Sequence, residues 1–224
     1  MNGIKGLITK DLLQLKTYKR TLIVFIFVFV VSGMQQETMD GAMSMITIML
    51  ILVFGMVGIA TFSYDEMAKA DRYILTLPLT RKEVVRAKYM LVILLTLVGA
   101  VLGVLASGII SYAMSKALPD FLELISYALG GILGIAFVEG IQIPCMYKFG
   151  AEKGRMQIFI VIAIMALLLG GIFFIGEKIN VNLPVNNILN ILTNFLPLVL
   201  LALTAIIYFV SYKIAYKLYS KKEI

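Results

Sequence analysis

Residues 64–89 read YDEMAKADRYILTLPLTRKEVVRAKY and separate two long apolar runs. Charged side chains alternate here with tyrosine, isoleucine and leucine, and Pro78 stands near the middle. The flanking runs, 42–64 and 89–115, are long enough to cross the hydrocarbon core of a bilayer, which takes a helix of about 20 residues. A solvated linker is the alternative interpretation, but the interspersed apolar residues favour a structured loop that docks on a partner.

The composition of the whole chain indicates a membrane protein. Of its 224 residues, 61% are hydrophobic and 15% are charged, whereas soluble domains are about 45–50% apolar and about 25% charged. Histidine is absent and Cys145 is the only cysteine. We therefore expect no histidine-ligated metal site and no intramolecular disulfide. Intramembrane proteolysis would need a histidine or a pair of intramembrane aspartates, so we expect no catalytic residues and no cofactor in this chain.

Six apolar runs predict an all-α, polytopic membrane protein with one transmembrane domain over 1–224. The first run is the weakest, because its strictly apolar part, 21–34, needs Tyr18, Lys19 and Arg20 to complete a span. The predicted spans are about 18–34, 42–64, 89–115, 125–147, 158–175 and 192–212.

The distribution of basic residues predicts the orientation of these spans. Six spans place both termini on one side, and of the 20 Lys and Arg residues all except Lys116 and Lys178 fall on that side. Because basic residues accumulate in cytoplasmic loops, we predict that both termini are cytoplasmic. The net charge of +7 thus indicates membrane orientation and not nucleic acid binding.

Both ends of the chain carry helical patterns. In 4–15, apolar residues recur every three or four positions and lysines occupy other faces, which predicts an amphipathic helix in the membrane interface. At the other end, four tyrosines are predicted to continue the last span through the headgroup layer. They are Tyr208, Tyr212, Tyr216 and Tyr219.

The charged loop 65–88 has helix start and stop signals. A short helix is predicted up to about Leu77, and Pro78 should break it. Thr80 is a suitable N-cap, with Glu83 three residues later as the other half of a capping box. A second helix should start there and continue directly into the next span.

A second cytoplasmic loop, 148–157, is shorter. Pro144 should end or kink the span before it, and Gly150 and Gly154 allow a tight reversal of the chain. By itself this loop is a weak signal for function.

Glu139 is an ionisable residue inside an apolar run. A carboxylate within the membrane is costly and normally faces protein or a watery cavity. Glu139 could line a substrate pathway, or it could make a structural hydrogen bond to Gln142 or to a neighbouring helix. Both interpretations stay open. Small residues at helical spacing, among them Gly99, Gly103 and Ser107, predict close helix packing, most simply within one subunit.

Both loops resemble those of a known family. The sequence of 64–89 resembles the first cytoplasmic loop of ATP-binding-cassette type-2 permeases. The segment 144–155, PCMYKFGAEKGR, resembles the loop after their fourth span. In length, span count and loop placement, the chain is most similar to the permease subunits of phenol-soluble modulin exporters and related bacterial peptide exporters.

This resemblance implies a permease subunit of an ATP-driven exporter of amphipathic peptides in the bacterial plasma membrane. Segment 71–79 would be the coupling helix, and 1–17 the elbow helix in contact with lipid. Two copies of a separate ATPase would bind ATP and Mg²⁺, since this chain has no phosphate loop. A second permease, identical or related, would complete the pathway. The alternative is a membrane sensor or immunity protein that recruits an ATPase without bulk transport.

The resemblance also implies which residues contact the ATPase. Those of the first loop are Asp71, Arg72, Tyr73, Leu75, Leu77, Pro78, Leu79 and Arg81. Those of the second loop are Lys148, Phe149, Gly150, Glu152 and Lys153.

Overall fold

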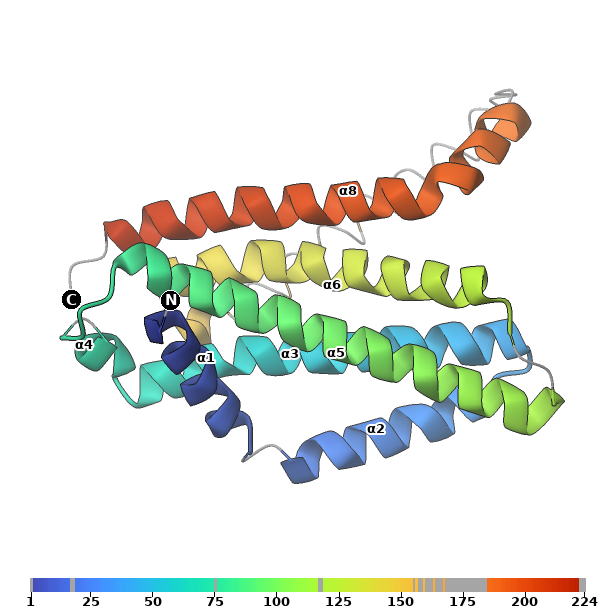
Figure 1. Cartoon of the computed structure of the whole chain (residues 1–224), viewed down its shortest axis with the longest axis horizontal. Coiled ribbons are helices and arrows are strands. Elements are labelled where there is room, and N and C mark those ends of the chain that lie inside the picture. The colour runs from blue at the N-terminus through green and yellow to red at the C-terminus, as the bar shows by residue number, and fades with distance from the viewer. Residues whose placement is uncertain are drawn as a thin grey trace.

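The computed structural model describes residues 2–16, 19–74, 76–116, 119–154 and 185–221, with 156, 159, 163 and 167, and it contains helices and no strands over these residues (Figure 1). The helices are α1 (Asn2–Leu15), α2 (Lys19–Met34), α3 (Met39–Met67), α4 (Ala70–Ile74), α5 (Arg81–Ser115), α6 (Phe121–Phe149) and α8 (Val185–Ser220).

Several of these helices are long and apolar enough to cross a membrane. Four qualify by themselves, namely α3, α5, α6 and the Pro197–Ser220 part of α8. Helices α1 and α2 form a further candidate together, bent by 69° between them. The chain is thus a multi-pass membrane protein. The predicted span 158–175 lies largely outside the described residues, so a total of six stays a prediction.

The long helices lie side by side around α3, which packs on α5 and α6, while α8 packs on α6 and α5 (Figure 1). Helices α1 and α4 lie at the same end of the bundle as the last residues of α6 and α8. We call this the basic end. The connection 35–38, the end of α5 and the start of α6 lie at the opposite end. Helices α6 and α8 both run toward the basic end, as a crossing at 158–175 would require.

The structure bears on two predicted helix boundaries. Helix α8 begins at Val185, seven residues before the predicted span 192–212, so residues outside that span are helical. The asparagines there favoured a loop, but Val185, Ile188, Leu189 and Leu192 recur at helical spacing. Helix α6 continues through Pro144 to Phe149, so Pro144 does not end this helix, whose last residue lies two positions after the predicted span 125–147. Proline lacks a backbone N–H, so the helix loses one hydrogen bond at Pro144. Interrupting the helix would leave several backbone groups without partners in an apolar environment, which costs more.

Small residues bring α3 and α5 into close contact, as predicted. A Cβ atom added to Gly103 would lie 3.0 Å from the Cα atom of Thr47, and one added to Gly99 would lie 3.0 Å from the carbonyl oxygen of Leu50. The Thr47 hydroxyl donates a hydrogen bond to Ser107 Oγ at 3.2 Å. The backbones of α3 and α5 therefore pack against each other within one subunit.

Candidate functional site

An apolar core at the basic end joins α4, through Ile74, to five longer helices. Leu7 of α1, Phe62 of α3, Val85 of α5, Tyr147 of α6 and Tyr219 of α8 are all buried in it. The Tyr147 ring packs edge-on against Phe62 at 5.3 Å and contacts Tyr219 at 5.1 Å between ring centroids. This core holds the loops at the basic end in fixed positions relative to the long helices.

Three of the four tyrosines of α8 pack inside the bundle, which the sequence did not predict; their depth at the headgroup layer stays a prediction. Tyr219 is fully buried, Tyr212 packs edge-on against Tyr89 at 5.6 Å, and Tyr208 donates a hydrogen bond to Glu139. These three residues share one face of α8, which is the face toward the bundle. The burial of aromatic area between helices explains this packing. Only Tyr216, 38% exposed, points outward.

The docking segment, as we call residues 65–88, is folded partly as predicted. The Thr80–Glu83 capping box is confirmed, since Thr80 N–H donates to Glu83 Oε2 at 2.8 Å and Glu83 N–H donates to Thr80 Oγ1 at 3.3 Å. Helix α5 then continues without interruption. Helix α4 ends at Ile74, earlier than the predicted end near Leu77. The Thr76 hydroxyl bonds to the Tyr73 carbonyl at 2.8 Å, and such local bonds compete with helix continuation.

The tip of the docking segment exposes large apolar side chains. Met67 is 81% exposed, Tyr73 72% and Leu77 49%, and Lys69 and Arg72 beside them are also exposed. Ile74 is buried in the core and Leu79 packs against it. These buried side chains hold the segment in place while the others face outward. The side chains of Asp71 and Leu75 lie outside the described part, so their predicted contacts stay predictions.

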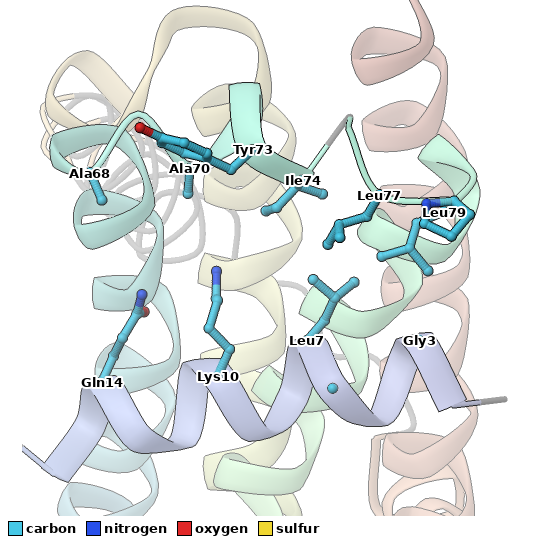
Figure 2. Close-up of a pocket in the computed structure, with 12 residues that line it drawn as sticks. Gly3, Leu7, Lys10, Gln14, Ala68, Ala70, Tyr73, Ile74, Leu77 and Leu79 are labelled. Atoms are coloured by element: carbon cyan, nitrogen blue, oxygen red, sulfur yellow. The ribbon is translucent and has the colours of Figure 1, made fainter.

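A groove of about 650 Å³ separates α1 from the docking segment (Figure 2). On the α1 side its wall includes Leu7, Lys10 and Gln14, as Figure 2 shows. The opposite wall is formed by Tyr73, Ile74, Leu77, Pro78 and Leu79 together with Ala68 and Ala70. The lining is mainly apolar, and the groove adjoins the exposed tip.

A buried ionic network lies beside this groove, and the sequence analysis missed it. Lys88 Nζ lies 2.8 Å from Asp11 Oδ2 and 2.6 Å from Asp65 Oδ2. Lys10 Nζ lies 2.5 Å from Asp65 Oδ1 and 3.0 Å from Asp11 Oδ1. Each lysine therefore contacts both aspartates, and the four charges sum to zero. The network joins α1, α3 and α5.

Further contacts surround the network. The Lys88 ammonium also donates to Thr61 Oγ1 at 3.1 Å and lies 5.1 Å from the centre of the Phe62 ring. Burial lowers the pKa of Lys10, but the hydrogen bond to Asp65 and the charges of both aspartates outweigh it and raise that pKa above its usual 10.5. Lys10 is therefore protonated near neutral pH.

A sequence signal for this network existed. Asp11 lies four residues from both Leu7 and Leu15, which are buried, so it falls on the apolar face of α1. Lys88 likewise lies four residues from both Val84 and Val92. A charge on a buried helix face normally has a partner of opposite sign.

Two further contacts tie the docking segment to its neighbours. The Glu66 carboxylate accepts a hydrogen bond from the Ala151 N–H at 2.5 Å, which joins the first loop to the second. Arg81 Nη1 donates to the carbonyls of Tyr219 at 3.1 Å and Ser220 at 2.7 Å, and so satisfies the last turn of α8. Arg81 thus holds α8, and its contact with an ATPase stays a prediction.

The second loop lies next to the first. Gly150 ends α6 and adopts φ +88°, a region that glycine enters without steric cost; the reversal of the chain stays a prediction. Lys148 and Phe149 are exposed, and the Lys148 ammonium lies 4.8 Å from the centre of the Phe149 ring. Glu152 and Lys153 are exposed as well. Both loops therefore face outward at the basic end.

Glu139 lies inside the bundle, where four helices meet. It is fully buried and accepts a hydrogen bond from Tyr208 of α8. Thr96 Oγ1 of α5 lies 3.5 Å from its carboxylate, and a Cβ added to Gly55 of α3 would lie 2.6 Å from Glu139 Oε1. Gln142, the partner considered in the sequence analysis, has an Oε1 atom without a hydrogen-bond partner in the described part. These contacts favour the structural interpretation of Glu139.

Comparison with known families decides the class of protein. The family described as ABC-2 family transporter protein matches residues 6–220. The chain belongs to this family. No curated protein and no solved structure matches it. As an ABC-2 permease, the chain is a membrane transport subunit of a generally non-catalytic kind, and its family implies an ABC ATPase as partner.

Proposed function

We propose that this chain is the permease subunit of an ABC exporter of amphipathic peptides, coupled through the docking segment to a separate ATPase. The observation that carries the proposal is the tip of that segment. Met67, Tyr73 and Leu77 are exposed, although Ile74 beside Tyr73 is buried in the core at the basic end. Apolar side chains exposed in this way, within a charged surface, are typical of a protein interface.

The surroundings of the tip fit an ATPase as the partner. The groove beside α1 offers apolar area next to the tip, and the second loop adds Lys148, Phe149, Glu152 and Lys153 on the same end of the bundle. Two ATPase copies, each binding ATP and Mg²⁺, would engage two permease subunits in the plasma membrane. The second permease, identical or related, would supply the rest of the pathway.

Co-purification tests the docking surface. The tagged protein is extracted in mild detergent, and the eluate is probed for an ABC ATPase. We expect Tyr73→Asp with Leu77→Asp to lose the ATPase, because a buried carboxylate without a partner opposes docking. The matched control is Phe121→Asp with Leu122→Asp, which introduces the same two charges at residues 71% and 62% exposed at the opposite end and should retain the ATPase. Equal recovery from all three proteins would reject the docking surface.

A membrane sensor or immunity protein that recruits an ATPase would give the same co-purification result. Transport separates the two functions. Inside-out vesicles that contain the complex should accumulate a fluorescent, amphipathic helical peptide when ATP is supplied. The Tyr73→Asp, Leu77→Asp protein should not accumulate it. An ATPase that binds without any ATP-dependent uptake of such peptides would favour the sensor.

A further inference from the structure

Helix α1 is attached to the docking segment at two places. Near its start, Gly3 lies against Leu79, so close that an added Cβ would be 2.2 Å from Leu79 Cδ2. Further along, Lys10 and Asp11 are ion-paired with Asp65 and Lys88. Asp65 and Lys88 are the first and last residues of the docking segment, and their own contact at 2.6 Å closes its base.

Burial makes the ionic network a firm connection. The side chains of Asp11, Lys88 and Asp65 are 2%, 7% and 10% exposed. Solvent and salt screen such buried pairs much less than surface pairs. Separating α1 from α3 and α5 would leave buried charges without partners, which is strongly unfavourable. The network therefore resists any motion that would part α1 from the docking segment.

Helix α1 is also the connection to α2. In the described part of the chain, α2 packs substantially on α3 alone, and α1 precedes it across a bend of 69°. Much of α2 is exposed, including Phe27 at 68%. A displacement of α1 would consequently change the position of a helix that few other contacts hold.

We propose that Lys10, Asp11, Asp65 and Lys88 are positioning residues that make α1 and the docking segment move as one unit, so that a displacement of this segment by the ATPase reaches α2. This inference rests on the proposed function. A network that served stability alone would also be buried, but its loss would not separate ATPase binding from the movement of α2.

The test follows α2 in the assembled complex. A spin label is attached to Phe27→Cys in a Cys145→Ser background, which leaves no other cysteine. Its mobility is recorded in lipid nanodiscs before and after addition of ATP and vanadate. We expect an ATP-dependent change in the otherwise unaltered protein. In Lys88→Met the ATPase should still co-purify, because the exposed tip is unchanged, whereas the spectral change should fall at least threefold.

Two variants separate positioning from general effects of substitution. Lys88→Arg keeps the charge and can contact both aspartates, so it should restore the spectral change. Arg86→Met removes an exposed charge two residues away and should behave like the parent. If Lys88→Met does not fold, Lys10→Gln replaces it, since Lys10 is the most exposed member at 34%, and a reduced change with the ATPase bound is expected.

The outcomes distinguish the inference from the function on which it rests. A full spectral change in a folded network variant, or no ATP-dependent change in the parent complex with the ATPase bound, would overturn the inference alone. If no ATPase co-purifies with the parent protein, the docking function fails and the inference fails with it.

Discussion

At Glu139, one carboxylate contacts side chains or backbone of three other helices. The sequence predicted its burial in the membrane from its position in an apolar run. Its partners could not be predicted, because Tyr208 is 69 residues away and had been placed at the headgroups. The choice between a structural and a pathway role is therefore best made by two substitutions that change different properties of the site.

The structural role predicts opposite results for these substitutions. Tyr208→Phe keeps the ring but removes the donor, so we expect the free energy of unfolding to fall by about 1–3 kcal/mol. Glu139→Gln keeps an acceptor for Tyr208, so we expect little change in stability and in peptide uptake. Thermal unfolding in detergent and vesicle uptake measure the two effects, with Tyr216→Phe as the exposed control.

The pathway role makes the contrary prediction for Glu139→Gln. If the negative charge attracts a substrate, uptake should drop although expression, stability and ATPase binding remain unchanged. That result would contradict the structural interpretation, whereas unchanged uptake would remove Glu139 from the pathway.

Among the elements, those defined by local chemistry were predicted best. The start of α5 follows from Thr80 and Glu83, whose contacts are within one turn. Helix α4 and the start of α8 were less well predicted, since turn bonds at Thr76 and asparagines in an otherwise helical pattern give conflicting local signals. The ionic network needed long-range information, because Asp11 and Lys88 meet only after α1 has folded back onto α5.

The capping box at the start of α5 gives a prediction at this scale. Thr80→Ala removes the hydroxyl that accepts the Glu83 N–H, and N-cap losses of this kind cost about 0.5–2 kcal/mol. We expect faster hydrogen exchange at the amides of 81–84, where the docking segment enters the span. Thr9→Ala is the control, because that exposed hydroxyl only bonds back to the Lys5 carbonyl within α1, and it should leave exchange at 81–84 unchanged.

At the scale of the whole molecule, the direction of the helices tests the topology. Helices α6 and α8 both run toward the basic end, so the chain between them has to return to the opposite end before α8 begins. The predicted span 158–175 provides this return. Lys178, one of two basic residues expected outside the cytoplasm, would then lie on the same side of the membrane as Phe121, and Lys153 would lie on the other side.

Single cysteines in the Cys145→Ser background measure this arrangement with a membrane-impermeant maleimide. We expect Phe121→Cys and Lys178→Cys to react in intact cells, since both face outward in a six-span protein. Lys153→Cys should react only in inside-out vesicles, because the basic loops are predicted to be cytoplasmic. If Lys178→Cys instead reacted together with Lys153→Cys, no span would separate them, and both the predicted span 158–175 and the explanation of the charge distribution would be wrong. If all three cysteines reacted as expected, the loops that carry most of the Lys and Arg residues would lie on the cytoplasmic side, where the ATPase docks.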